Sequence, residues 1–534
     1  MMKKIYALLL LVLATASAGE HLVRIDLTEV RLAPLAQRGL RVLAELENCA
    51  IVLLDDAEFE KISSLDHQIL ASAPQEGDYY LARPMTGTAD LTLFSNILTR
   101  DVEDYLIKVH QGMLEQVLNQ KVMVKRLSFT PMVLSSAADL PVFPRVSYNE
   151  TVAEILTLVD ADSILAKVQR LQDFVTRLSI HDSCLAAAYH IHDRFTALGL
   201  DSVFFQYHTT GHAPNVIAIK RGTLYPDSIY AVICGHFDSY AFYSPNFAPG
   251  ADDNASGTSA VLEAARVMRD YDFEYSIRYI AFSGEEYGMY GSGYYAQHAR
   301  AQGDSILGVI NGDMLAYVDI APESLEVIAK PSNPPCEPFA DFFIAAADTY
   351  TALLTHKQLS YTMVYSDHAP FWDQGYLALC NIEDWTNYGT NNPFIHSTGD
   401  SIGAGFNNLA FCTECTKAEI AALALLAVPV GTGIAEAPAD RPGNVVICVR
   451  PSVSKGLFAI SLASGSMDLV GLRIHDVTGR LVKNIALPSS ETSRLLSVTW
   501  DGTDNAGQQL AAGIYFVAVD NGAATQTEKL VLIR

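Results

Sequence analysis

Three short motifs carry acidic and imidazole side chains that together can hold divalent metal ions. They are Gly235–Ser239 (GHFDS), Pro249–Gly257 (PGADDNASG) and Ser283–Tyr287 (SGEEY). Zinc accepts histidine, aspartate and glutamate as ligands, and two ions held side by side need a carboxylate between them to offset their repulsion. The motifs therefore predict a two-metal site. Asp252 is the candidate for the carboxylate that both ions share.

The motifs fall at the ends of elements that can position them. Apolar runs at 228–234 and 275–282 predict buried strands, and helical spacing from Thr258 to Asp270 predicts a helix. In open α/β sheets, functional sites lie at the carboxyl ends of the strands. Strands and helices alternate to about residue 430, which predicts an α/β domain with a mixed, mostly parallel sheet flanked by helices.

In order and spacing, the motifs resemble those of the bacterial di-zinc aminopeptidases, a family that also includes glutamate carboxypeptidases and glutaminyl cyclases. The resemblance covers roughly residues 150–430. It implies the zinc exopeptidase fold, two zinc ions as cofactors and peptides as substrates, hydrolysed at the N-terminal residue. The implied metal ligands are His236, Asp252, Glu286, Asp313 and His396.

Two acids, Glu285 and Asp238, are the candidate catalytic residues. By resemblance, Glu285 is the general base, whereas Glu286 binds metal. Adjacent residues in an extended segment point in opposite directions, so one can face the water and the other the metal. Asp238 lies two residues after His236, where its carboxylate can accept the second N–H of the imidazole.

Other acids near the motifs are interpreted differently. Asp313 lies in an apolar run, where an unpaired carboxylate would be costly, so a metal partner is favoured. Asp253 and Asn254 are expected to shape a turn and to cap the following helix. By resemblance, Asp400 matches an acid that follows the last histidine ligand in the family.

Four residues, Asp367, His368, Tyr365 and Glu383, are candidates for substrate binding. By resemblance, Asp367 and His368 bind substrate or support the ligands. Glu383 is either a partner for a substrate ammonium group or an ordinary surface residue. The oxyanion-donating tyrosine of the family has no counterpart just before His396, so Tyr365 and Tyr361 are the candidates for that role.

Length and charge limit the classes of protein that this chain can be. At 534 residues it is too long for one ordinary core, and two to four domains are expected. A net charge of −24 argues against nucleic acid or an anionic membrane as partner. We divide the chain into a signal peptide (1–18), an N-terminal domain (19–145), a peptidase domain (146–434) and a linker with a C-terminal domain (435–534).

The first residues predict export. A positive start, an apolar run at 5–13 and the small residues Ala16-Ser-Ala18 are typical of a secretory signal cleaved after Ala18. The next most apolar segment, Ile420–Val430, is too short to span a membrane and is interpreted as a buried helix. The mature protein is therefore expected to have no integral membrane segment and to be secreted or held at the cell surface.

Residues 19–145 contain no cluster of metal-ligand type and predict an α+β accessory domain. A strand at His21–Asp26, a helix around Leu32–Leu46 and a strand at Ala50–Asp55 begin it. A prodomain or folding aid, and an accessory domain that stays attached, are equally compatible with this segment. After it, helices are expected at 151–166, 167–178 and 183–198.

The C-terminal region changes to short alternating strands after the Pro-rich linker at 435–442. Its segments Leu472–Arg480, Val498–Gly507 and Gly513–Val517 resemble the immunoglobulin-like β-sandwich found at the ends of many exported bacterial proteins. The resemblance implies sorting or surface attachment, with contact to the cell surface or the secretion machinery. A passive spacer domain is the alternative.

Eight cysteines in an exported chain permit disulfides without specifying them. The lone C-x-x-C at Cys412–Cys415 is interpreted as a disulfide or as two free thiols rather than a metal site.

Two rival functions remain open. A carboxypeptidase or a glutaminyl cyclase of the same fold would retain many of these polar positions. A surface adhesion protein with an inactive enzyme-like domain is the second rival, although an inactive relative would be expected to lose a ligand or the base.

Overall fold

The computed structural model describes most of the chain between residues 19 and 532. The described ranges are 19–27, 31–85, 87, 89–134, 143, 145–383, 385–386, 389–390, 392–430, 445–450, 453–454, 458–464, 471–476, 479–485, 495–520 and 525–532. The chain divides into two compact units, Met1–Thr432 and Gly433–Arg534. The predicted signal peptide and the Pro-rich linker lie outside the described residues.

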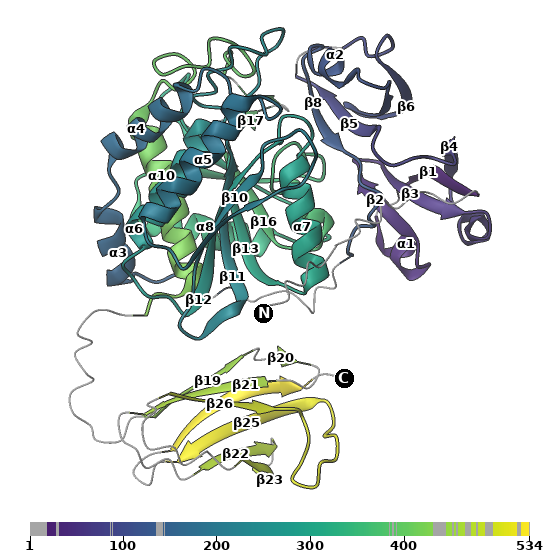
Figure 1. The fold of residues 1–534 in the computed structure, drawn as a ribbon. Coiled ribbons are helices and arrows are strands. Elements are labelled where there is room, and N and C mark those ends of the chain that lie inside the picture. Colours follow the sequence, from purple (N-terminus) through teal and green to yellow (C-terminus); the bar gives the residue numbers. More distant parts are fainter. Residues whose placement is uncertain are drawn as a thin grey trace, which may run out of the picture. The chain divides into compact units, whose positions relative to one another are not determined.

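An eight-stranded mixed sheet forms the centre of the first unit (Figure 1), in the order β15-β14-β16-β13-β11-β12-β10-β9. The parallel pairs β12/β11, β11/β13 and β13/β16 form its middle, and β9 and β10 pair antiparallel at one edge. This confirms the predicted mixed, mostly parallel sheet. The strands are β9 (Ser202–Gln206), β10 (Asn215–Lys220), β11 (Tyr225–His236), β12 (Tyr275–Phe282), β13 (Ser305–Gly312), β14 (Ser324–Ala329), β15 (Leu354–Leu359) and β16 (Ala378–Ile382).

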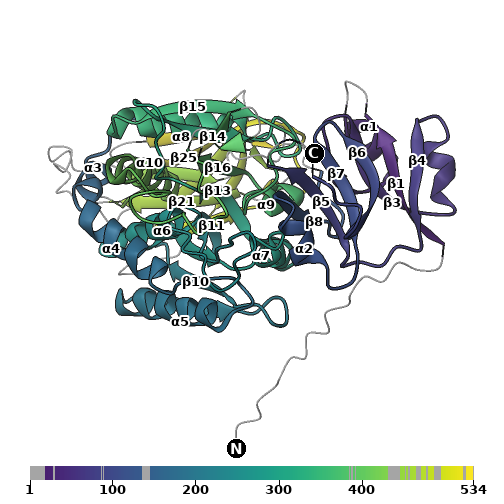
Figure 2. The same cartoon turned by 90° about the horizontal axis from the view of Figure 1, so that it is seen from above.

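Helices cover both faces of this sheet: α4, α6 and α10 lie on one side, and α7 and α9 on the other (Figures 1 and 2). Their bounds are α3 (Glu150–Thr157), α4 (Ala161–Gln172), α5 (Asp182–Ala197), α6 (Ala255–Met268), α7 (Tyr290–Gln302), α8 (Glu337–Tyr350), α9 (Ala369–Asp373) and α10 (Leu409–Ala427). The break between the first two helices comes earlier than predicted, because Asp160 caps α4 by accepting the amide of Asp162. The apolar segment predicted at 420–430 belongs mostly to the buried end of α10.

Two four-stranded antiparallel sheets form the N-terminal region, which spans 19–134 of the described residues. Their orders are β2-β3-β1-β4 and β6-β7-β5-β8. The predicted helix from Leu32 to Leu46 is wrong: Gly39, at φ +66°, follows a short helix, and a strand paired with β3 comes next. The elements are β1 (Glu20–Asp26), α1 (Ala33–Gln37), β2 (Arg41–Glu45), β3 (Cys49–Asp55), η1 (Glu58–Ile62), β4 (His67–Ser72), β5 (Tyr79–Pro84), β6 (Ser95–Asp101), β7 (Asp104–Val109), α2 (Leu114–Leu118) and β8 (Val122–Arg126).

The N-terminal region shares its core with the peptidase sheet. One continuous apolar cluster contains Leu106 of β7 and Ile233 of β11. Lys330, almost fully buried, lies 3.2 Å from the Glu45 carboxylate of β2. Since such contacts are made between the two regions, residues 19–134 pack as part of the first unit.

Two sheets also form the second unit, in the orders β19-β21-β24 and β20-β26-β25-β22-β23. Trp500 stacks on Phe458 and meets Tyr515 edge-on in its core. This confirms the predicted all-β C-terminal fold. The strands are β19 (Val445–Arg450), β20 (Val453–Ser454), β21 (Phe458–Ser464), β22 (Gly471–Asp476), β23 (Leu481–Ile485), β24 (Leu495–Trp500), β25 (Gly513–Asp520) and β26 (Thr525–Leu532).

Within the described part of the chain, no helix combines the length and apolarity that a membrane span requires. The seven cysteines from Cys49 to Cys415, which include Cys412 and Cys415, are buried free thiols. Of the two interpretations of the C-x-x-C sequence, the structure therefore shows two thiols.

Candidate metal centre

The predicted ligands gather where neighbouring parallel strands end. His236 is the last residue of β11, Glu285 and Glu286 follow β12, and Asp313 follows β13. Because these strands are adjacent and parallel, their carboxyl ends meet at one edge of the sheet. Asp253 reaches the same place from the turn before α6.

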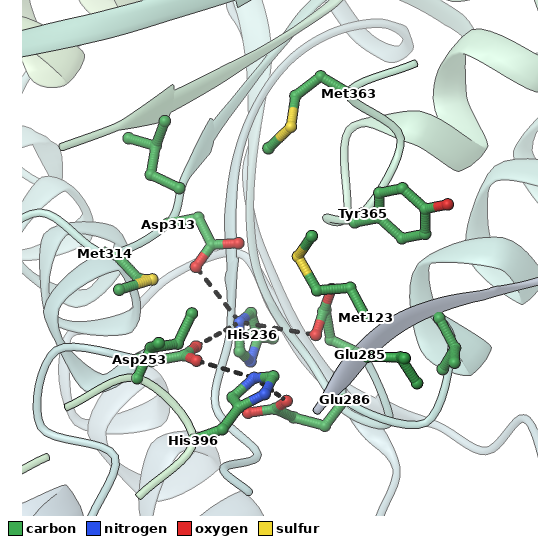
Figure 3. A pocket seen from close by; sticks show the side chains of 14 residues that line it. Met123, His236, Asp253, Glu285, Glu286, Asp313, Met314, Met363, Tyr365 and His396 are labelled. Atoms are coloured by element: carbon green, nitrogen blue, oxygen red, sulfur yellow. Dashed lines mark ion pairs between the residues drawn. The ribbon is translucent and has the colours of Figure 1, made fainter. Parts of the chain in front are cut away.

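Two groups of three side chains there have ligand atoms close enough to hold one ion each. The first is His236, Asp253 and Asp313, and the second is Asp253, Glu286 and His396. Figure 3 shows Asp253 between the two histidines, with Oδ1 3.3 Å from His236 Nε2 and Oδ2 3.2 Å from His396 Nε2. His236 Nε2 lies 3.4 Å from Asp313 Oδ1, and His396 Nε2 lies 2.7 Å from Glu286 Oε2.

The charges of this donor set fit divalent cations. Asp253, Glu285, Glu286 and Asp313 are all less than a tenth exposed. Among the described residues that line their pocket there is no lysine or arginine. Burial raises the pKa of Glu286 to about 7 in spite of the neighbouring His396, and burial raises the pKa of Glu285 well above its usual range. Burying several carboxylates without a cation is costly, and bound metal ions would remove that cost.

Glu285 and Glu286 face different halves of the site. The Glu285 carboxylate lies 3.9 Å from His236 Nε2, whereas the Glu286 carboxylate contacts His396. Asp238 holds the backbone of both glutamates, because its carboxylate oxygens accept the Glu285 and Glu286 amides at 3.3 and 3.4 Å. The second imidazole nitrogen of His236 lies 3.2 Å from the backbone carbonyl oxygen of Asp238 and 3.6 Å from its carboxylate. Asp238 therefore positions the acids as well as the histidine.

The buried guanidinium of Arg177 ties together two loops that carry ligands. It donates to the carbonyl oxygens of Phe237 at 2.6 Å and of Pro249 and Gly250 at 2.7 Å. The first carbonyl follows His236, and the other two precede Asp253. This fixes the distance between the β11 end and the α6 turn.

The structure corrects the prediction for Asp252. Its carboxylate points away from both groups of ligand atoms, accepting the Ala316 amide at 2.9 Å and the Asn392 side-chain amide at 2.8 Å. The central place belongs to Asp253, which had been expected only to shape the turn. Backbone direction decides which of the two adjacent acids faces the histidines.

Asp400 and Asn254 set that backbone direction. Asp400 accepts the amides of Asp252 and Asp253, both at 3.0 Å. Asn254 caps α6 as predicted, accepting the amide of Gly257 at 2.8 Å. The turn is thus held from both sides.

Only one of the four candidate substrate residues lines the pocket. Tyr365 does so, with its hydroxyl directed away from the ligands and donating to Asp104 of β7 at 2.5 Å (Figure 3). Asp367, His368 and Glu383 are fully or almost fully buried outside the lining. His368 instead contacts the carbonyl oxygen of Met363 at 2.8 Å, and burial lowers its pKa to about 3.

Sequence reasoning missed the apolar part of the pocket. Its walls include Met314, Met363, Ile382 and Ile395 from the peptidase domain, together with Val122–Val124 of β8. Nothing in the β8 sequence points to a functional site, since apolar residues in a strand are usually core. Only the long-range packing of the N-terminal region places them here.

Two segments of the chain match known protein families. Residues 215–409 match Peptidase family M28, and residues 451–524 match the FlgD Ig-like domain. The structure is similar to that of the LapA aminopeptidase of Legionella pneumophila, with a TM-score of 0.55 and 20% identity over 66% of this chain and 99% of that chain. At this identity the likeness establishes a shared fold.

Among proteins of known sequence, the chain is similar to Aminopeptidase YwaD of Bacillus subtilis, with 30% identity over 36% of this chain and 41% of that protein. It is also similar to a probable leucine aminopeptidase of Arthroderma benhamiae, with 28% identity over 49% of this chain and 72% of that protein. A probable zinc metalloprotease of Pyricularia oryzae is 38% identical over 19% of this chain and 20% of that protein. The chain thus spans less than half the length of the Bacillus and Pyricularia proteins.

Proposed function

We propose, from the premise that residues 215–409 form a Peptidase family M28 domain, that this protein is a zinc-dependent aminopeptidase with two metal positions. The observation that carries the proposal is the place of Asp253, one carboxylate shared by two groups of buried ligands. Relatives named as aminopeptidases and zinc metalloproteases support the metal and the reaction.

Each residue at the sheet edge has a part in the proposed reaction. His236 and Asp313 would hold one zinc ion, Glu286 and His396 the other, and Asp253 both. When bound, zinc supplies Lewis acidity, which polarises a carbonyl group and makes a water molecule more acidic. Glu285 takes the proton of the attacking water and passes it to the leaving amine.

The charge of the pocket favours the N-terminus of a peptide over its C-terminus. A carboxypeptidase needs a cation to hold the terminal carboxylate of its substrate, and the described lining supplies carboxylates and no lysine or arginine. An α-ammonium group meets the opposite situation, because acidic side chains attract it. This supports aminopeptidase over carboxypeptidase activity.

The test uses the full chain, aminoacyl anilides and their N-acetylated counterparts. We expect hydrolysis of the free-amine substrates only, loss of activity on chelation and recovery with added zinc. Metal analysis of the purified protein gives the ion count independently of turnover. Equal hydrolysis of blocked and free substrates would refute the aminopeptidase assignment. Zinc-loaded protein without any hydrolysis would leave the inactive or cyclase alternatives, which a glutaminyl-peptide substrate separates.

We also propose that the protein is exported and that the Ig-like domain contributes to sorting or surface attachment. The signal-type sequence of residues 1–18 and the match of residues 451–524 support this. Fractionation of producing cells tests it: protein confined to the cytoplasm would contradict export. A chain ending near Ala435 should keep its activity and lose surface retention.

A further inference from the structure

Strand β8 of the N-terminal region lies in the wall of the candidate active site. Val122, Met123 and Val124 line the same pocket as His236 and Glu285. Figure 3 shows Met123 beside Glu285. Residues outside the segment that matches the peptidase family therefore face the place where a substrate must bind.

The strand is fixed to the turn that carries the catalytic acids. β8 is the edge strand of its sheet and pairs with β5 on one side. On its other side, the Arg126 amide donates to the Gly288 carbonyl oxygen at 3.2 Å, just after the Glu285–Glu286 pair. Lys125 forms an ion pair with Asp373 at 2.7 Å. Two consecutive residues thus join β8 to the peptidase domain next to the pocket.

A buried polar cluster holds the same strand from behind. Arg83 of β5, which is the register partner of Met123, donates two hydrogen bonds to Asp104, at 2.9 and 2.6 Å. Asp104 also accepts the hydroxyl of Tyr365 from the peptidase domain. Arg83 and Asp104 are 2% and 1% exposed, and removing one partner of a buried charge pair is strongly unfavourable. Breaking the contact between this cluster and Tyr365 would therefore be unfavourable, which favours a β8 that stays in the pocket wall.

The pocket that β8 leaves is small, and apolar side chains line it beside the acidic ones. Its volume is about 40 Å³. Met123, Met314 and Met363 surround this space with Ile382 and Ile395. A small apolar side chain fits such a space, whereas a bulky one meets the thioether of Met123.

We propose that β8 is part of the substrate site and that Met123 is a specificity-determining residue that restricts the enzyme to small apolar N-terminal residues. The proposal rests on the aminopeptidase function proposed above. It assigns the N-terminal region a lasting role in substrate choice.

The test compares the full-length protein with its Met123→Ala variant on alanyl, leucyl and phenylalanyl anilides. We expect the ratio of kcat/KM for the phenylalanyl substrate to that for the alanyl substrate to rise at least tenfold, since a single methylene in an apolar pocket changes discrimination by about 10–200-fold. Met113→Ala is the matched control. Met113 is 39% exposed on the same region, outside the pocket lining, and its replacement should leave the ratio unchanged.

A second variant keeps the test decisive if Met123→Ala fails to fold. Met123→Val removes less volume and should shift the ratio in the same direction by a smaller factor. Wild-type activity with an unchanged ratio in both variants would overturn the role of Met123. An equal rise for all three substrates would also overturn it, because β8 would then act as an inhibitory cover. A wild-type protein that hydrolyses none of the substrates, free amine included, would instead refute the proposed function.

Discussion

Glu263 on α6 and Glu286 after β12 are two buried glutamates whose pKa values are shifted in opposite directions. Glu263 is fully buried, and burial alone would raise its pKa. Arg266 and Lys167 donate hydrogen bonds to the Glu263 carboxylate at 2.5 and 2.7 Å. Their positive charges outweigh the effect of burial, and the pKa of Glu263 falls to about 2. Glu286 is 5% exposed and contacts the imidazole of His396, and burial raises its pKa to about 7.

The difference teaches how to distinguish structural acids from metal-binding acids. Where the chain supplies its own lysine and arginine, the negative charge of a buried carboxylate is already neutralised. Such a carboxylate stabilises the fold and does not need a metal ion. Where the described pocket lining gathers carboxylates without a lysine or arginine, bound cations would supply the missing positive charge. Substitutions at the two kinds of site should therefore affect different measurements.

The largest loss of activity is expected for substitution of Glu285, which belongs to neither of the two groups of metal-ligand side chains. Glu285→Gln keeps the size of the side chain but removes the basic oxygen, so kcat should fall by about 10²–10⁴-fold with zinc content unchanged. Glu286→Gln should instead lower zinc occupancy, and excess zinc should restore part of its activity. Rates and metal content of both variants at several zinc concentrations decide this. If Glu285→Gln loses zinc while Glu286→Gln keeps it, the two roles are exchanged.

A sharper comparison is available between the neighbours Asp253 and Asp252. Asp253→Asn removes charge from the carboxylate that both groups share, so zinc affinity should fall by more than the roughly 10–100-fold typical of residues that only support ligands. Asp252→Asn changes a carboxylate that contacts Ala316 and Asn392, and its effect should stay within that range. Titration of the metal-free proteins with zinc measures both. A greater loss for Asp252→Asn would restore Asp252 as the shared ligand.

The smallest effect on activity is expected at Glu263, where stability should change instead. Glu263→Gln leaves Lys167 and Arg266 without their buried partner and should lower the free energy of unfolding by about 3–5 kcal/mol at neutral pH, with zinc content unchanged. Because the pKa of Glu263 is depressed in the folded state, its contribution is complete above the usual glutamate pKa of about 4.5 and is lost as the pH falls toward 2. Urea unfolding of both proteins across this range should show the difference narrowing. A constant difference would mean that the charge of Glu263 does not stabilise the fold.

The sequence predicted those features that depend on local pattern. Strand β12 was predicted to the residue, since its apolar run is buried along its whole length. His236, Glu286, Asp313 and His396 do come together, because they follow recognisable elements or motifs.

Other features depend on contacts far along the chain and escaped prediction. Whether Asp252 or Asp253 faces the histidines is set by Asp400, about 150 residues later in the sequence. The contribution of β8 to the pocket depends on packing between the N-terminal region and the peptidase domain, which no local sequence pattern encodes. For the same reason the segment after Leu32 was mistaken for one helix: its strand is stabilised by pairing with β3.

The guanidinium of Arg177 has a consequence for the energetics of cation binding. By joining the loop after His236 to the turn before Asp253, it orders both backbones when the chain folds. Ordering a residue costs about 1–2 kcal/mol in backbone entropy, and here that cost belongs to folding. An ion at the proposed site would meet a pre-organised cage, so its affinity would reflect mainly the exchange of hydration water for protein ligands. This is the opposite of a zinc finger, in which metal binding and folding are one event.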